Sequence, residues 1–186
     1  MSDAAVSVLP VHPPRVTLAV VQDDPELLAY LQMGDDYLGT IGYTEHGLRH
    51  SNLTAHLAGT ILSRLGYTER EAEIAEIAGF IHDVGNCVSR SDHWISSALI
   101  ARAALTRLGM PYDEVAIVMN AVGNHEEDAS DPATPVAAAV VIAFVGCTVG
   151  SVGATGGGSG GGGSGGGGGG RGGGGTNTWG LIKYMD

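Results

Sequence analysis

Apolar residues recur every three to four positions through most of residues 25–144, which is the period of an amphipathic α-helix. No stretch of similar length alternates apolar and polar residues as a half-buried strand does. We therefore predict an all-α fold, a compact helical bundle. The apolar positions expected along its helices are, in chain order, Leu27, Leu28 and Leu31; Tyr37, Leu38 and Ile41 on a second short helix; Leu53, Leu57, Ile61, Leu62 and Leu65; Ile74, Ile77, Ala78 and Ile81; Ile95, Leu99 and Leu105; Val115, Val118 and Met119; and Val136 to Phe144.

Residue types at the helix ends support these boundaries. Asp24 precedes Pro25, and proline is favoured at the first position of a helix, where its missing N–H would have no partner. Thr68 and Glu71 have the spacing of a capping box, which marks the start of a helix. Gly66 follows an apolar stripe and is suited to ending the helix before it.

The segments outside the helical region differ from it in composition. Residues 1–24 combine several prolines with small and β-branched residues, so we expect an extended leader. Residues 25–146 are the predicted helical domain, and residues 147–186 are a glycine-rich, low-complexity tail. Such a tail buries too little apolar surface to offset the entropy of ordering its backbone, so we expect it to be disordered.

The balance of charge limits the expected partners. The chain has 20 acidic residues against 9 basic ones and a formal net charge of -11. Nucleic acid polymers and anionic membranes are bound through many basic groups, so we expect neither as a partner. A small anionic substrate would need metal ions to offset the negative field of the protein.

The cysteines and the hydropathy indicate a compartment. Cys87 and Cys147 form neither a disulfide framework nor a CxxC pattern, which is typical of a reducing environment. No apolar run is long enough to span a membrane, and no signal-peptide pattern opens the chain. We therefore expect a cytoplasmic protein.

Histidines and one aspartate recur at the ends of the predicted helices. They are His50, His82, Asp83, His93 and His125. Imidazole nitrogens together with a carboxylate form a mixed ligand set that suits divalent ions such as Mn, Fe, Zn or Ni. The array therefore predicts a metal site in the core of the bundle.

The adjacent pair sets a geometric condition on this site. Consecutive residues diverge by about 100° around a regular helix, so His82 and Asp83 can share an ion only where the helix loosens. We expect Gly85 to provide that freedom. Glu126 and Glu127 are expected to form a solvated acidic turn, with orientation of an imidazole or acceptance of a proton as the alternative.

Four segments that carry these residues resemble the HD-domain metal-dependent phosphohydrolases: residues 43–50, 78–86, 92–100 and 123–126. The resemblance extends over about residues 25–143. It implies a compact helical domain in which His50, His82 and Asp83 bind a first metal ion. In binuclear members, the residues matching His93 and His125 bind a second ion and Asp83 bridges the two. The family hydrolyses phosphomonoesters or phosphodiesters, often of nucleotides.

Two departures from the family pattern affect this prediction. The family closes its site with an aspartate in the last core helix, where this chain has Phe144. Either the sequence from Phe144 onward is not the natural one, for which out-of-frame reading of GC-rich DNA is one explanation, or this chain has lost a ligand. The cyclic-dinucleotide phosphodiesterase branch has a lysine at the place of Asn86 and a Gly-Tyr-Pro motif after His125. This chain has neither, so we expect the plain HD type.

The predicted function is hydrolysis of a small phosphorylated substrate, nucleotides being one candidate class, by a water activated on one or two divalent ions (Mn, Fe, Zn, Ni or Mg). Asp83 is expected to be the catalytic residue, and Arg49 and Asn86 are expected to bind substrate. The alternative is a catalytically inactive metal-binding HD module, in which the missing carboxylate is genuine. Association of identical chains remains open.

The glycine-rich tail yields a prediction about stability. Deletion of residues 151–186 is expected to leave the melting temperature unchanged, because the deleted residues offer few apolar side chains. Differential scanning calorimetry of the full and shortened chains measures this. A large fall in melting temperature would show that the tail packs on the domain.

Overall fold

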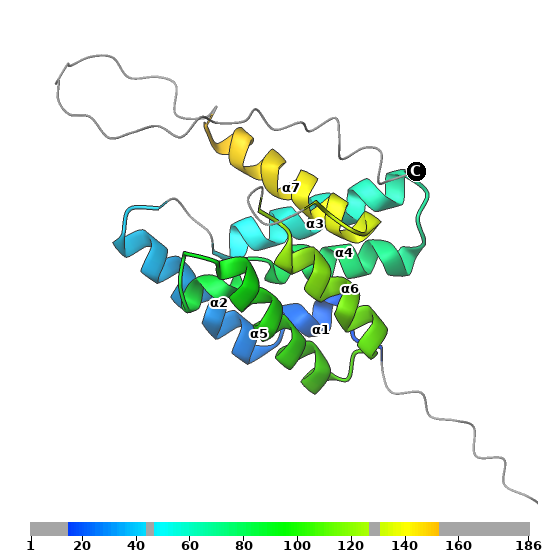
Figure 1. The fold of residues 1–186 in the computed structure, drawn as a ribbon, viewed down its shortest axis with the longest axis horizontal. Coiled ribbons are helices and arrows are strands. Elements are labelled where there is room, and N and C mark those ends of the chain that lie inside the picture. Colours follow the sequence, from blue (N-terminus) through cyan, green and yellow to red (C-terminus); the bar gives the residue numbers. More distant parts are fainter. Residues whose placement is uncertain (1–14, 44–46, 127–130, 153–186) are drawn as a thin grey trace, which may run out of the picture.

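The structure is a computed structural model that describes residues 15–43, 47–126 and 131–152. Within these residues it contains α-helices and one short 3-10 helix but no β-strand, which confirms the predicted all-α fold (Figure 1). The elements are α1 Leu18–Gln22, α2 Pro25–Thr40, α3 Leu48–Arg64, α4 Glu69–Ile81, η1 Val84–Cys87, α5 His93–Leu108, α6 Tyr112–Gly123 and α7 Pro135–Val152.

Helix α4 is the centre of the bundle. It packs against α1, α3, α6 and α7, while η1, which follows it, packs against α2 and α5 (Figure 1). A helix in this position must be apolar around most of its circumference. Its buried residues are Ala72, Ile74, Ala75, Ile77, Ala78, Gly79, Phe80 and Ile81.

The helix ends follow the sequence signals with one exception. The Asp24 side chain accepts a hydrogen bond from the backbone N–H of Leu27 at 3.0 Å and begins α2 at Pro25. Thr68 and Glu71 form the predicted capping box of α4. The predicted second short helix with Tyr37 is wrong, because α2 continues without a break to Thr40.

The two ends of the predicted domain also differ from the structure. The leader is not extended throughout, since Thr17 caps the short helix α1, whose Val21 is buried in the core together with the preceding Val16. Helix α7 continues to Val152, past the predicted domain boundary at residue 146. The predicted disordered tail lies outside the described residues from 153 onward.

The predicted stripes of leucine and isoleucine on α3 and α5 are correct in part, because Leu62 and Leu105 are buried and Leu57 and Ile61 pack against the core. The other predicted members, Leu53 of α3, its C-cap residue Leu65, and Ile95 and Leu99 of α5, are exposed. Apart from the predicted ligands, the buried residues of these helices are mostly small, namely Ser51, Thr54, Ala55, Ala58, Gly59 and Leu62 on α3, and Ser97, Ala101, Ala104 and Leu105 on α5.

Close approach between backbones explains these small residues. A Cβ atom added to Gly79 of α4 would lie 3.0 Å from the backbone of Ala55 in α3. A Cβ atom added to Gly85 would lie 2.3 Å from the carbonyl oxygen of His93 and 2.4 Å from the backbone nitrogen of Ser97. The N–H of Gly85 donates to Ser97 Oγ at 2.7 Å. Gly85 does not have a positive φ, so glycine is required there for contact with α5 and not for backbone freedom.

Among the described helices, none has both the length and the apolar character that crossing a membrane requires.

The contact at Gly85 yields a prediction. Gly85→Ala is expected to lower the free energy of unfolding by about 1–3 kcal/mol, the usual cost of overpacking, because the new methyl group meets backbone atoms of α5. Urea denaturation measures the change. Gly39→Ala in α2 is the matched control, since a Cβ atom there meets nothing within 4 Å and alanine favours a helix by about 1 kcal/mol. Equal stability of both variants would contradict the close contact.

Candidate metal centre

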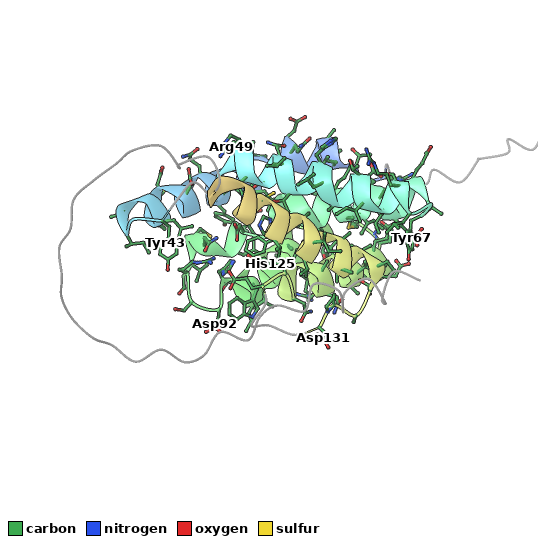
Figure 2. The ribbon with its side chains drawn as sticks, turned by 90° about the horizontal axis from the view of Figure 1, so that it is seen from above. Tyr43, Arg49, Tyr67, Asp92, His125 and Asp131 are labelled. Carbon is green, nitrogen blue, oxygen red and sulfur yellow. The ribbon has the colours of Figure 1, made fainter. Side chains whose placement is uncertain are left out.

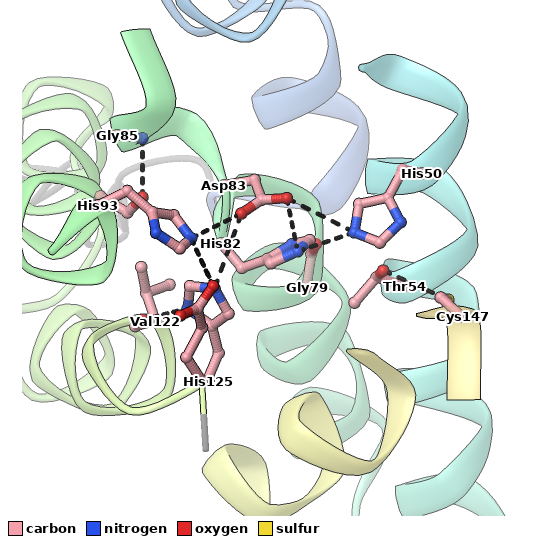
Figure 3. Close-up of polar contacts among 12 residues, drawn as sticks. His50, Thr54, Gly79, His82, Asp83, Gly85, His93, Val122, His125 and Cys147 are labelled. Atoms are coloured by element: carbon pink, nitrogen blue, oxygen red, sulfur yellow. Dashed lines mark hydrogen bonds and ion pairs between the residues drawn. The ribbon is translucent and has the colours of Figure 1, made fainter. Parts of the chain in front are cut away.

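The residues of the predicted array converge at the middle of the bundle (Figure 3). His50 lies in the first turn of α3, His82 follows the last residue of α4, and Asp83 precedes η1. His93 begins α5, and His125 follows α6. All five are buried, with exposed fractions between 0% and 9%.

The first group consists of His50, His82 and Asp83. The two Nε2 atoms are 3.1 Å apart. Asp83 Oδ2 lies 3.6 Å from His50 Nε2 and 3.3 Å from His82 Nε2.

The second group consists of Asp83, His93 and His125. Asp83 Oδ1 lies 2.9 Å from His93 Nε2 and 3.7 Å from His125 Nε2. The two imidazole Nε2 atoms are 3.1 Å apart. Asp83 therefore belongs to both groups and presents one carboxylate oxygen to each (Figure 3).

The spacing within each group fits ligands of one ion. Two atoms bound to the same ion at about 2.1 Å are separated by about 3.0 Å in octahedral geometry and about 3.4 Å in tetrahedral geometry. The distances of 2.9–3.7 Å within the two groups surround these values. The described residues thus contain two adjacent groups that could each hold a divalent ion.

Backbone hydrogen bonds orient the imidazoles. Nδ1 of His82 lies 2.7 Å from the carbonyl oxygen of Gly79, and Nδ1 of His125 lies 2.7 Å from that of Val122 (Figure 3). Nδ1 of His93 lies 3.2 Å from the carbonyl oxygen of Arg90. A carbonyl oxygen only accepts, so each Nδ1 carries the proton. In the neutral ring, Nε2 then has a free lone pair, as a metal ligand requires.

Positive charge is needed at the centre of this cluster. Burial raises the pKa of the Asp83 carboxyl, but electrostatic attraction to His82 and hydrogen bonding with His125, His82 and His93 outweigh burial and hold the pKa well below its ordinary value. With neutral imidazoles those hydrogen bonds do not exist, and lone pairs face one another around a buried carboxylate. Protons or divalent ions must therefore supply the charge.

A change of helix type brings His82 and Asp83 together. The α-helical backbone ends at His82, and Asp83, with φ -98° and ψ 3°, leads into the tighter turn of η1. The two side chains therefore do not diverge as they would on a regular helix, and His82 Nε2 lies 3.3 Å from Asp83 Oδ2. The helix thus changes type at the predicted place. Gly85, which was expected to give backbone freedom there, has no positive φ and packs closely on α5 instead.

Phe144 of α7 lies beside both ligand groups. The resemblance to the HD-domain phosphohydrolases implies a carboxylate at this position. The Phe144 ring centroid is 6.2 Å from that of His50, 5.8 Å from His82 and 5.3 Å from His125, each in an edge contact. The side chain at position 144 thus faces the cluster, as a closing ligand would. In this chain an apolar ring occupies that place.

Residues outside the predicted ligand set also reach the second group. Arg90 Nη2 donates to Glu126 Oε1 at 2.7 Å, and this oxygen lies 3.6 Å from His93 Nε2. Glu126 is therefore part of the site and not only a solvated turn, while Glu127 lies outside the described residues. Arg90 was not predicted, although its position three residues before His93 was the available signal.

The two predicted substrate-binding residues differ in placement. Asn86 in η1 is 4% exposed, and among the described residues its amide has no hydrogen-bond partner. Arg49 lies beside His50 in α3 but is exposed. In the view of Figure 2, Arg49 lies at the edge of the molecule, whereas His125 is fully buried. The structure thus buries the Asn86 side chain, which lies against Gly34 of α2, and leaves Arg49 exposed.

Relatives named ribonuclease Y align with part of this chain, as three of them show. Ribonuclease Y of Bacillus pumilus (strain SAFR-032) is 27% identical over 154 residues, which cover 72% of this chain and 28% of the relative. Ribonuclease Y of Oceanobacillus iheyensis is 31% identical over 101 residues, which cover 54% and 18%. Ribonuclease Y of Clostridium botulinum (strain Hall) is 34% identical over 88 residues, which cover 46% and 15%. The chain thus spans less than a third of the length of these relatives.

The remaining comparisons concern solved structures and protein families. No solved structure shows a significant match to this chain. The HD domain family matches residues 47–143, slightly more than half of the chain, and this range includes every member of the two ligand groups. On this match the chain belongs to the HD domain family.

Proposed function

We propose that this domain is a metal-dependent phosphohydrolase whose two ligand groups hold a pair of divalent ions bridged by Asp83. The observation that carries the proposal is the single buried carboxylate shared by two sets of imidazole nitrogens at ligand spacing. Membership of the HD domain family supports it. Mn, Fe, Zn, Ni and Mg remain the candidate ions.

The first ion would be held by His50, His82 and Asp83 Oδ2, and the second by His93, His125 and Asp83 Oδ1. When bound, such ions supply Lewis acidity toward a phosphoryl oxygen and a water of lowered pKa. Asp83 would act as the catalytic residue by fixing the spacing of the two groups. The Nδ1–H groups of His82 and His125, which donate to the carbonyl oxygens of Gly79 and Val122, would hold these imidazoles in the orientation that ligation requires.

The proposed substrate is a small phosphoric ester and not a nucleic acid polymer. The relatives named ribonuclease Y favour a phosphodiester of RNA as the second candidate. A polymer would, however, meet a chain of net charge -11 with only 9 basic residues, which disfavours contacts along a phosphate backbone. A nucleotide fits both observations, because it contains a phosphoric ester and is much smaller than a nucleic acid polymer.

The rival proposal is an inactive metal-binding module. Phe144 leaves the first group with two imidazoles and one shared carboxylate. Lower negative charge at the ligands weakens the binding of a divalent ion. The identity of residue 144 therefore separates a strongly hydrolytic domain from a weakly active or inactive one.

Replacement of Phe144 tests the two proposals. Phe144→Asp is expected to raise metal affinity by at least about tenfold and to raise hydrolysis with it, because the new carboxylate faces both ligand groups. Metal content by mass spectrometry and Mn-supplemented hydrolysis of p-nitrophenyl phosphate, a nucleoside monophosphate and an oligoribonucleotide are measured together. Cleavage of the oligoribonucleotide alone would support the second substrate candidate.

Phe144→Asn is the matched control, because it opens the same space without adding charge. Equal gains from both variants would mean that removal of the ring, and not the carboxylate, is responsible. Robust and equal activity in the original chain and in Phe144→Asp would contradict the missing-ligand argument. Inactivity in both with full metal content would favour the binding module.

Single replacements test whether Asp83 is shared. Asp83→Asn is expected to reduce Mn binding at both groups, since it removes the one anionic ligand common to them. His93→Gln is expected to reduce binding at the second group only. Titration of Mn followed by electron paramagnetic resonance counts the bound ions. An Asp83→Asn chain that loses no more Mn than His93→Gln would contradict a bridging carboxylate.

A further inference from the structure

Arg90 lies at the outer side of the second ligand group. It stands in the loop between η1 and α5, three residues before His93. Its side chain is 26% exposed, whereas the His93 side chain is fully buried. A molecule that approaches the second group from solvent can therefore touch Arg90.

The guanidinium lies over the face of the His93 ring. Arg90 Nη1 is 3.2 Å from Nδ1 and 3.1 Å from Nε2 of His93. An atom nearly equidistant from both ring nitrogens and in the ring plane would overlap the carbon between them, so Nη1 must lie above the plane. The in-plane lone pair of Nε2 thus stays directed at Asp83 Oδ1, 2.9 Å away. Arg90 does not block the ligand atom.

Two further contacts fix the guanidinium in place. Nη2 donates to Glu126 Oε1 at 2.7 Å. The Tyr43 ring packs against the guanidinium carbon with a centroid distance of 5.5 Å, within the range of a cation–π contact. The guanidinium is therefore held before any ligand arrives.

The same guanidinium keeps donors that no protein oxygen uses. Arginine has five N–H donors, and in the described part of the chain Glu126 Oε1 is the one oxygen that the Arg90 side chain contacts as an acceptor. A partly exposed, oriented cation with spare donors suits the tetrahedral oxygens of a phosphoryl group, which guanidinium binds as a fork.

We propose that Arg90 binds the phosphoryl group of the substrate beside the second ligand group, positioned for this by the His93 ring, Glu126 and Tyr43. This inference rests on the proposed phosphohydrolase function. It also answers the charge problem, since an anion entering a chain of net charge -11 would meet a fixed positive group next to the ligand cluster.

Inorganic phosphate is the probe that tests this role. Binding to the Mn-loaded full chain is measured by calorimetry, in parallel with metal content. Arg90→Gln is expected to weaken phosphate binding by at least about tenfold, the loss typical of a charge-assisted hydrogen bond, with metal content unchanged. Arg90→Lys is expected to recover part of the affinity, because it restores the charge but not the fork.

Arg102→Gln is the matched control. Arg102 is exposed on α5, nine residues beyond His93. Its replacement therefore removes the same charge about 13 Å further along the helix than His93, and it should not alter phosphate binding. The series is repeated with Phe144→Asp, where loss of Arg90 is expected to raise KM for p-nitrophenyl phosphate more than it lowers kcat.

Unchanged phosphate affinity in Arg90→Gln would overturn the proposal. Loss of metal in parallel with phosphate would also overturn it, because Arg90 would then only support His93. The absence of phosphate binding by both the original chain and Phe144→Asp would overturn it as well. Failure of the hydrolytic function is read separately. In that case phosphate binding would depend on Arg90, but neither the original chain nor Phe144→Asp would hydrolyse the ester.

Discussion

The buried carboxylate of Asp83 imposes the central constraint on this domain. Its oxygens face four imidazole nitrogens of buried side chains at 2.9–3.7 Å. Because the Nδ1 atoms of three of these rings point to backbone carbonyl oxygens, the opposite nitrogens are left as lone pairs. Such a cluster is destabilising without added positive charge, which protons or divalent ions can supply.

That packing depends on small residues where large apolar ones were expected. The histidine ligands come from α3, the end of α4, the start of α5 and the end of α6. Their side chains are short, yet their ring nitrogens must lie within about 3 Å of one another to bind one ion. The backbones must therefore approach closely, as they do at Gly79 against Ala55 and at Gly85 against Ser97. Leu53 and Ile95, on the same two helices α3 and α5, lie at the surface.

Much of this arrangement could be predicted from sequence because local signals determine it. The cap at Asp24 and the capping box at Thr68 depend on residues near one another in the chain. The histidines are 32 residues apart within each pair, and they could be predicted because their residue types and spacing resemble a known family. The buried faces of α3 and α5 were predicted only in part, since hydrophobic periodicity does not show where two backbones touch. The contact of Arg90 with Glu126 joins residues 36 positions apart, and no local pattern indicates such a pair.

Position 144 joins the stability of the bundle to its chemistry. Helix α7 packs on α3, α4 and α6, and its Phe144 ring meets the histidines edge-on at 5.3–6.2 Å. An aromatic ring there shields the cluster from water and adds apolar contact, which stabilises the bundle without any ion. A carboxylate would place a second buried negative charge beside Asp83 and would be tolerated only with ions bound. The side chain at 144 thus decides whether the fold depends on its metal or only accommodates it.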